Sequence, residues 1–591
     1  MDKARQLKRE RGEIKDRTKS RRERERESEC PRTQRASLAL ARSIEYFCGY
    51  IHKQKWIHRQ NRVSVNQDTG SRKYSSIDNK EKEMNDEIAT NAKEESRGKG
   101  TAMMNVYGSD EKEESQSYVV TKEIIKIELK ELIRLTWPIV LQMGSQQVML
   151  AADLIFVGRL GRFEMTVGSL FTVLFLLCWY FLAGLTSAMD TLASQAHGAN
   201  DARAVKSWTI VCFAVVSVAC FPAAAFLFSS EAIVKNVLKR SDAIAREVGR
   251  ACVILFPGLW FMSWALVYQK YLQMQGRVNP VGITSFLTLM LNIGLNQLFI
   301  HELGMGLQGA PIATTISRFA NLCFLFIYSV GSSYYETHEQ RRIEITEWIE
   351  AKKAITKKMF MRAANLSFHG GLMLASEAWA FEVTVITTSM LGMLELDAHN
   401  ALLSVCGLSF MTGPMAFGIA ASIRVGNLLG MNKPNIAHTA ARMYISVGLA
   451  WMVLTSILIS IFARHIGNLY TGGDHEIADL VVKLAPLAAT FQVFDALLGI
   501  CNGVLRACGR QRILALTNMC ALWGVGVTLG TSLAFATSLR VRGVWIGLTA
   551  GVIASGSSLA TMVHFVDWKV EAEKAKESAV NKTIEDTDVE A

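Results

Sequence analysis

The sequence predicts an all-α polytopic membrane protein in which twelve transmembrane helices form two related halves. Three observations lead to this prediction. Half of the 591 residues are hydrophobic and only 20% are charged, and the mean hydropathy is +0.19. Apolar runs of about 20 residues, the length that crosses a bilayer as a helix, recur along the chain, and the second half of these runs repeats features of the first. This composition argues against an ordinary soluble protein.

The apolar runs begin after residue 130, and their lengths and spacing define the expected helices. We place these helices at 133–158, 166–190, 207–229, 248–272, 279–301, 310–331, 362–392, 398–423, 438–464, 479–505, 513–537 and 543–567.

The two ends of the chain differ in character from this apolar part. Residues 1–120 are rich in mixed charge and contain little to bury, so we expect a disordered cytoplasmic tail. A basic arm on anionic lipid or RNA is the alternative for this segment. The net charge is +11, and much of it lies in flanking segments and loops. Basic residues in such places set the orientation of a membrane protein, and this explains the charge better than nucleic-acid binding does. Residues 569–591 form a second polar tail.

The internal repeat fixes the domain organisation. The stretch LGRFEM at Leu160 resembles LGMLEL at Leu391, an offset of 231 residues. Three further glycine pairs follow at offsets of 232, 233 and 234 residues: Gly198 with Gly430, Gly276 with Gly509, and Gly309 with Gly543. Because six helices is an even number, both copies enter the membrane from the same side, as in parallel repeats. We expect an N-lobe at 121–331, a connector at 332–361 and a C-lobe at 362–568.

Basic residues indicate the orientation. The connector reads EQRRIEITEWIEAKKAITKKM, and we interpret it as a charged cytoplasmic loop. Further cations fall on the same side of the predicted helices and are interpreted as loop residues: Arg203, Lys206, Lys270, Arg424 and Arg506. Both termini are therefore expected in the cytoplasm. The eleven cysteines are scattered and form no CxxC pair, so neither a disulfide framework nor a metal site is expected.

Two acidic residues inside apolar runs are the strongest candidates for function. A carboxylate at the centre of a membrane costs about 2.5 to 3.5 kcal/mol on insertion scales, so it usually has a function. Glu377 in SEAWAFEV and Asp495 in FQVFDALLGICNG both lie near the middle of their predicted helices. Glu382 is rotated by about 140° from Glu377 on a helix of 3.6 residues per turn. We expect Glu382 to support the site from behind.

Other polar residues extend these positions into stripes that could line a cavity. In the first helix Gln142, Gln146 and Asp153 share a face. When the two copies of the repeat are aligned, Gln146 corresponds to Glu377 and Asp153 to Thr384. The remaining candidates are Thr388 on the seventh helix, Asn292 and Asn296 on the fifth, and Phe491 and Asn502 on the tenth. The structural alternative is that such groups only join helices by hydrogen bonds. The two asparagines fit that alternative best.

Enzymatic functions find little support in the sequence. The chain contains no GxxxxGK[ST] phosphate loop and no HExxH motif, so neither an ATP-driven pump nor a zinc hydrolase is predicted. We expect no enzyme activity and no cofactor.

Four stretches together resemble the signatures of the multidrug and toxic compound extrusion (MATE) transporters. They are SAMDTLASQAHGAN at 187–200, SEAWAFE at 376–382, RVGNLLG at 424–430 and NGVLRACGRQ at 502–511. The resemblance runs from about residue 130 to 568. Eukaryotic members typically carry a Glu-Trp-Trp-x-aromatic-Glu stretch, and Glu377 and Glu382 fall on its two acids. This sequence departs from the family pattern with Ala378 in place of the first tryptophan, Ala507 in place of a glycine and Leu428 in place of a frequent Glu.

The resemblance implies two bundles of six helices around a central cavity. It implies export of organic cations in exchange for protons or Na⁺, with Glu377 and Glu382 serving coupling and substrate binding. Asp495 is similar to an acid of plant members and Asp153 to one of bacterial members. We expect deprotonated acids to hold the cation, aided by aromatic side chains, and protonation to release it when the lobes rock outward.

The expected protein is a monomer in the plasma or vacuolar membrane, with small organic cations and membrane lipids as its partners and no nucleic acid. Three alternatives stay open. The protein could export organic anions such as citrate or conjugated metabolites, it could be a flippase for lipid-linked sugars, or it could be a channel or receptor.

Overall fold

The computed structural model describes residues 122–333, 338–471 and 475–587, and these residues contain helices and no strand. Within them, eleven helices are long and apolar enough to cross a membrane. Many large apolar side chains on these helices are exposed, as expected for surfaces that face lipid. The predicted disordered tail of residues 1–120 lies outside the described residues.

The N-terminal bundle consists of the first six long helices, some of them divided into segments. Its elements are α4 (Lys122–Gly158), α5 (Arg162–Leu185) with α6 (Ala188–Gly198), α7 (Ala202–Phe228), α9 (Asp242–Met274), α10 (Asn279–Asn296) with η3 (Gln297–Glu302), and η4 (Gly306–Gln308) with α11 (Gly309–Ser333). Two short segments, α8 (Ser230–Ala232) and η2 (Ile233–Val237), join α7 to α9.

The C-terminal bundle repeats this order. Its elements are α13 (Lys357–Ser389), α14 (Met393–Phe410) with η5 (Met411–Met415) and α15 (Ala416–Gly430), α16 (Pro434–Thr471), α17 (His475–Ala507), α18 (Gln511–Asn518) with η6 (Met519–Val527) and α19 (Thr528–Ala536), and α20 (Val541–His564).

α13 is the twelfth long helix, and it is not among the eleven most apolar ones. It has 33 residues and contains both Glu377 and Glu382, whose charges lower the hydropathy of the segment. Its length is sufficient to span a bilayer, and it takes the place of the first helix in the second copy of the repeat. The prediction of an all-α membrane protein with two six-helix bundles is confirmed.

The repeat is visible in the backbone as well as in the sequence. Residues with positive φ fall at matching positions of the two halves: Gly161 (151°) with Gly392 (148°), Asn200 (60°) with Asn432 (57°), Gly276 (72°) with Gly509 (76°), and Gly306 (57°) with Arg540 (47°). Side chains with a Cβ rarely adopt this conformation, so four matched pairs are not expected by chance. The two halves therefore turn their chains in the same way at the same helix ends.

The connector, expected as a loop, is instead a helix, α12 (His338–Lys353). Its sequence EITEWIEAKK contains strong helix formers and neither Gly nor Pro, which favours a helix. α12 packs on α7, where Lys206 Nζ lies 2.6 Å from Glu347 Oε2 and the Lys206 ammonium lies 5.6 Å from the Trp348 ring centre. The polar segment after α20 also forms a helix, α21 (Trp568–Thr587), and buries Glu571 and Ala572.

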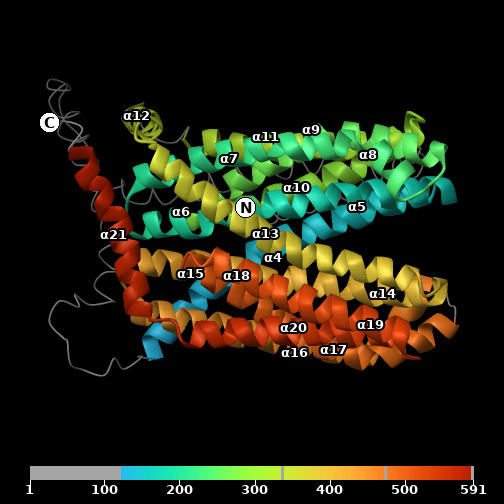
Figure 1. Cartoon of the computed structure of the whole chain (residues 1–591). Helices are drawn as coiled ribbons and strands as arrows, with labels where there is room; N and C mark the ends of the chain where they lie inside the picture. The colour runs from blue at the N-terminus through green and yellow to red at the C-terminus, as the bar shows by residue number, and fades with distance from the viewer. Residues whose placement is uncertain (1–121, 334–337, 472–474, 588–591) are drawn as a thin grey trace, which may run out of the picture. The chain divides into compact units, whose positions relative to one another are not determined.

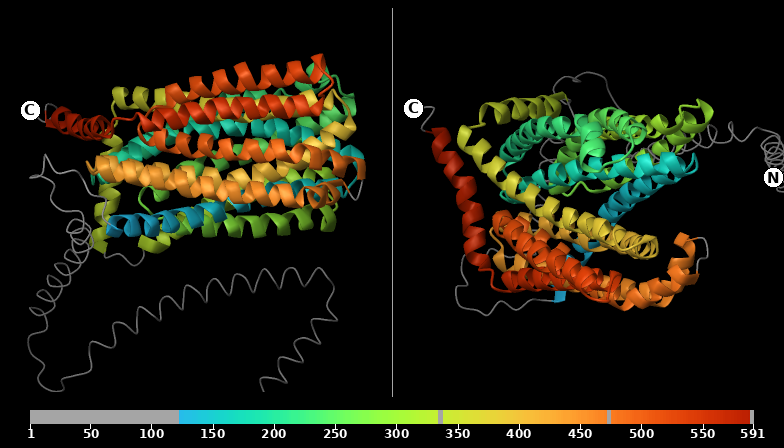
Figure 2. Two further views of the ribbon diagram at one scale, coloured as in Figure 1. Left: turned by 90° about the horizontal axis from the view of Figure 1, so that it is seen from below. Right: turned by 45° about the vertical axis from the view of Figure 1, so that its right-hand side comes forward.

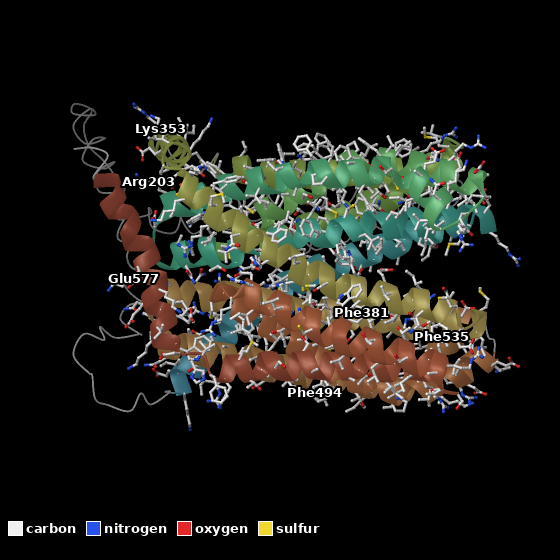
Figure 3. The ribbon with its side chains drawn as sticks, in the orientation of Figure 1. Arg203, Lys353, Phe381, Phe494, Phe535 and Glu577 are labelled. Carbon is white, nitrogen blue, oxygen red and sulfur yellow. The ribbon has the colours of Figure 1, made fainter. Side chains whose placement is uncertain are left out.

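The two bundles lie side by side at the end that carries α12 and α21, and they diverge toward the opposite end (Figures 1 and 2). We call the first of these the connector end. Figure 3 places Arg203, Lys353 and Glu577 there, whereas Phe381 and Phe535 lie farther along the C-terminal bundle.

Glycines allow the backbones of the two bundles to touch near the connector end. A Cβ atom at Gly198 would lie 2.1 Å from the carbonyl oxygen of Asn427, and one at Gly430 would lie 2.1 Å from that of Gln195. Only a residue without a side chain fits such an approach. The bundles are therefore closely packed at this end.

Candidate functional site

The structure brings Glu377 and Asp495 together inside the C-terminal bundle. Glu377 on α13 is 5% exposed, and Asp495 on α17 is 3% exposed. The two carboxyl groups are close enough to interact electrostatically. Neither forms a hydrogen bond or an ion pair within the described part of the chain, and Asp495 Oδ1 is buried without a partner there. Two neighbouring acids without donors cannot both be ionised at low cost.

A row of aromatic rings lies one helical turn from each of the two acids. Phe381 packs edge-to-face on Phe491, with ring centres 6.0 Å apart. Phe491 packs in the same way on Trp545 at 5.9 Å, and Trp545 contacts His399 at 5.6 Å. Edge-to-face packing is a favourable geometry for aromatic pairs. These contacts join α13, α17, α20 and α14 in one row of rings.

Thr384 and Thr388 are buried on the same helix as Glu377. Thr384 Oγ1 donates to the carbonyl oxygen of Phe381 at 2.7 Å and lies 3.3 Å from His399 Nε2. Thr388 donates to the carbonyl oxygen of Thr384 at 2.7 Å. Both threonines thus use their hydroxyl groups within α13 or toward its neighbour α14. Neither of them donates a hydrogen bond to Glu377.

Glu382 is half-buried and forms no hydrogen bond within the described residues. It shares a neighbour with Glu377, because the hydroxyl group of Tyr180 on α5 interacts electrostatically with both acids. Tyr180 belongs to the N-terminal bundle and was not predicted. Trp379 also crosses between the bundles, and its indole nitrogen donates to the Leu177 carbonyl oxygen at 3.2 Å. The part of α13 from Glu377 to Glu382 thus faces α5.

Asp153 has a different environment in the N-terminal bundle. It accepts a hydrogen bond from Asn296 Nδ2 at 2.6 Å and another from Thr314 Oγ1 at 2.8 Å. Asn296 also contacts Asn292 Oδ1 at 3.1 Å. Arg318, one helical turn beyond Thr314, interacts electrostatically with Asp153. Unlike the pair in the C-terminal bundle, this carboxylate accepts hydrogen bonds from described residues.

Gln142 belongs to a ladder of amides closer to the connector end. Its Nε2 donates to Gln269 Oε1 at 2.8 Å, and its Oε1 accepts from Gln273 Nε2 at 2.7 Å. Gln269 continues the ladder to Asn321 Oδ1 at 3.4 Å. Gln146 lies beside this ladder without joining it. Asn502 is buried on α17, two turns from Asp495 toward the connector end, and its Oδ1 has no partner among the described residues.

The sequence did not predict an ion cluster that joins the bundles at the connector end. Asp190 on α6 forms ion pairs with Lys270 on α9 and with Arg506 on α17, whose Nε lies 3.2 Å from Asp190 Oδ2. All three side chains are buried. Arg506 also interacts electrostatically with Glu377. One carboxylate therefore serves two cations, and a fourth ionisable group, Glu377, interacts with one of these cations, Arg506.

Hydrogen bonds between α6 and the C-terminal bundle reinforce this cluster. Thr191 Oγ1 donates to the Arg506 carbonyl oxygen at 2.5 Å, Gln195 Nε2 donates to the Ala507 carbonyl oxygen at 2.8 Å, and Gln511 Nε2 donates to Thr191 Oγ1 at 2.8 Å. We call the Asp190, Lys270 and Arg506 cluster together with these bonds the latch. The bundles cannot separate at the connector end without breaking it.

A second ion pair between the bundles joins Glu128 on α4 to Arg424 on α15. It is bidentate, with Nε–Oε2 and Nη2–Oε1 distances of 2.9 and 2.5 Å. Lys206, Lys270, Arg424 and Arg506 were interpreted as loop cations, and this was wrong, because all four are buried on helices. The signal that could have found them is their position inside the predicted helices or within two residues of a helix end, where a charge needs a partner.

The described residues contain no group of three or more His, Cys, Asp or Glu side chains that could hold a metal ion.

Comparison with known proteins identifies the family. The MatE family model matches residues 138–298 and 371–531, which together make up more than half of the chain. The two matches also follow the internal repeat.

Individual relatives agree with this result. The chain is 30% identical over 458 residues to multidrug and toxin extrusion protein 1 of Xenopus tropicalis, covering 76% of this chain and 77% of that protein. It is 28% identical over 456 residues to Protein DETOXIFICATION 12 of Arabidopsis thaliana, covering 76% and 92%. The crystal structure of the eukaryotic MATE transporter AtDTX14 is 25% identical and superposes with a TM-score of 0.70, covering 77% of this chain and 99% of that one. The chain belongs to the MATE family of multidrug and toxin extrusion transporters.

Proposed function

We propose that the protein is a secondary antiporter that exports organic cations in exchange for protons, with Na⁺ as the alternative coupling ion. The observation that carries this proposal is the pair formed by Glu377 and Asp495. Both carboxyl groups are buried, they interact with each other, and no described residue donates a hydrogen bond to them or lies within ion-pair distance of them. In such a place a negative charge is stable only when a proton or another cation accompanies it.

Competition for the same carboxyl groups supplies the coupling. When Glu377 and Asp495 are deprotonated, they attract an organic cation, and the rings of Phe381 and Phe491 add a favourable surface for it. When they take up protons, this attraction is lost and the cation leaves. A proton and a cation that exclude each other from one site exchange across the membrane if the site opens to each side in turn.

The arrangement of the bundles supports such alternation. The latch and the Glu128–Arg424 pair hold the connector end closed, whereas the bundles diverge at the other end (Figure 2). We assign the connector end to the cytoplasm, with both termini on that side, so this conformation opens outward. Export then requires the latch to break and the opposite ends to approach each other.

Arg506 provides a link between the acids and the latch. It pairs with Asp190 and interacts with Glu377, while Lys270 pairs with the same Asp190. With Glu377 deprotonated, two carboxylates balance the two cations. Protonation of Glu377 leaves one carboxylate for two buried cations, which weakens the latch. In the proposed cycle the proton-loaded carrier is therefore the one that returns to face the cytoplasm.

Glu382 and Asp153 have supporting roles in this proposal. Glu382 shares Tyr180 with Glu377 and affects coupling through that contact, and Asp153 forms a second polar site in the N-terminal bundle. The proposed carrier acts as a monomer in the plasma or vacuolar membrane.

Flux measurements in proteoliposomes test the proposal. The purified protein should accumulate tetraethylammonium when a proton gradient is imposed, and Glu377→Gln should abolish this uptake while the protein is still inserted. A sodium gradient of equal size should drive no uptake. Uptake driven only by sodium would replace the proton as the coupling ion, and passive conduction without counterflow would indicate a channel.

A further inference from the structure

The N-terminal bundle contains a buried arginine without a partner. Arg318 on α11 is 7% exposed, and its Nε atom has no hydrogen-bond partner among the described residues. No ion pair within 4 Å joins it to a described carboxylate, although Asp153 interacts with it at longer range. A buried guanidinium group is costly unless hydrogen-bond acceptors surround it.

Arg318 faces a small pocket between four helices. The pocket is lined by Gln146 of α4, Trp179 of α5, Met262, Ala265, Leu266 and Gln269 of α9, and Arg318 and Asn321 of α11. Its free volume of about 10 Å³ is room for a single water molecule or one oxygen of a larger group. Gln146, Trp179 and Leu266 are half-buried, so the pocket is not sealed within the bundle.

Most polar groups of the pocket offer donors, and the amide of Gln146 offers both a donor and an acceptor. Besides Arg318, the Trp179 indole nitrogen is free of hydrogen bonds in the described residues. The carbonyl oxygen of the Asn321 side chain already accepts from Gln269, which leaves its NH₂ group for the pocket. The Gln269 side-chain oxygen is likewise occupied, by Gln142. The lining contains no carboxylate. A pocket with a guanidinium group, an indole N–H and amide N–H groups is suited to an anion.

We propose that the Arg318 pocket is a subsite for the carboxylate of a transported molecule, with one carboxylate oxygen entering between Arg318, Trp179 and Asn321. Apolar side chains of Met262 and Leu266 at the same pocket would contact the carbon next to the carboxylate. This inference rests on the proposed function, because it assigns the subsite to the transport pathway. It adds that substrates include molecules with an anionic group, for which the acids of the C-terminal bundle provide no partner.

Asp153 limits the affinity of this subsite. Two of its acceptor positions are occupied by Asn296 and Thr314, but its charge still attracts Arg318. An entering carboxylate competes with that attraction. Removing the charge of Asp153 should therefore tighten anion binding, whereas a purely structural role of Arg318 predicts no such change.

Ligand-induced thermal stabilisation of the purified full-length protein tests the proposal without any gradient. Benzoate should raise the melting temperature in a saturable way, and neutral benzamide at the same concentration should not. Arg318→Gln should weaken apparent benzoate affinity about tenfold or more, as expected for loss of a charged hydrogen bond. Arg318→Lys should retain part of the affinity, since lysine keeps the positive charge but lacks the paired N–H donors of the guanidinium group. Asp153→Asn should strengthen binding severalfold.

Controls keep the test decisive. Arg250→Gln removes an exposed arginine on α9 and should leave benzoate binding unchanged. If Arg318→Gln does not fold, Trp179→Phe removes the indole N–H while it keeps an aromatic ring, and it should weaken binding about threefold. Equal stabilisation by benzoate and benzamide, or unchanged benzoate affinity in the Arg318 and Trp179 variants, would overturn the subsite.

Competition with chloride tests the chemical class of the anion. Displacement of benzoate by equimolar chloride would overturn the carboxylate assignment in favour of an inorganic anion. Tetraethylammonium flux is measured separately, so its failure affects the proposed antiport and not this result.

Discussion

The two bundles hold their buried acids in opposite ways. In the N-terminal bundle Asp153 accepts hydrogen bonds from Asn296 and Thr314 and has Arg318 nearby. In the C-terminal bundle Glu377 and Asp495 interact with each other, and Arg506 interacts with Glu377, but no described residue donates a hydrogen bond to either acid. Hydrogen-bond donors stabilise the ionised form of an acid, and a second acid in a dry surrounding disfavours it. The two copies of the repeat therefore share a backbone but differ in their acids: one acid accepts hydrogen bonds, and the other copy holds a pair of acids that does not.

The largest expected effect comes from removing the acids of the C-terminal bundle. Glu377→Gln and Asp495→Asn each keep the side-chain shape and remove the ionisable group, so proton-driven uptake of an organic cation should fall at least a hundredfold. Uptake is measured in proteoliposomes with matched protein content. Asp479→Asn, at the exposed beginning of the same helix as Asp495, serves as control and should keep full activity. Normal uptake by both site variants would remove the pair from the mechanism.

The latch should show the next largest effect, on stability rather than on binding. Asp190→Asn leaves Lys270 and Arg506 buried without their shared carboxylate. Breaking a buried ion pair from one side costs about 3 to 5 kcal/mol. Denaturation monitored in detergent should reveal this loss.

The exposed pair of Lys235 and Asp242 offers a matched control for the latch. Asp242→Asn should cost less than about 1 kcal/mol, as surface ion pairs contribute little. Equal losses of stability for Asp190→Asn and Asp242→Asn would contradict the account of the latch.

Asp153→Asn should have a smaller effect on transport than either change in the C-terminal bundle. The asparagine keeps one oxygen for Thr314 or Asn296, so the expected loss of stability is about 1 to 2 kcal/mol. Transport of an organic cation should fall less than tenfold. A loss as large as that of Glu377→Gln would mean that both bundles exchange protons, and it would remove the contrast between them.

Thr384→Val gives the smallest expected effect and tests the repeat itself. Thr384 occupies the position that Asp153 occupies in the first copy, yet it only donates to a carbonyl oxygen of its own helix and contacts His399. Valine has nearly the same shape. Stability should decrease by about 1 kcal/mol and transport by less than about threefold. A strong transport defect would show that this face of α13 acts directly on the substrate.

Much of the fold could be predicted because it depends on local signals. The length and spacing of apolar runs predicted the helices, and the offset of Leu160 and Leu391 predicted two copies whose helix ends then showed matching positive φ values. The helix of the connector was missed because its charge was read as a loop signal, although its residues favour a helix and Trp348 packs on Tyr271, with ring centres 5.4 Å apart.

The candidate site was predictable only in part. Glu377 and Asp495 stood out because a charge inside an apolar run is unusual, but their interaction depends on how α13 and α17 are placed within the C-terminal bundle. The latch joins Asp190 to Arg506 across more than 300 residues of chain, and no spacing rule connects them. Arg318 was overlooked because the search for charges within helices considered acids only.

The most direct test of the central claim measures protons during cation binding. When tetraethylammonium is added to the weakly buffered, detergent-purified protein, a pH indicator should report proton release that saturates with binding and disappears in the Glu377→Gln, Asp495→Asn double variant. Saturable cation binding by the unaltered protein without any proton release would contradict the claim that protons and cations compete for these two acids.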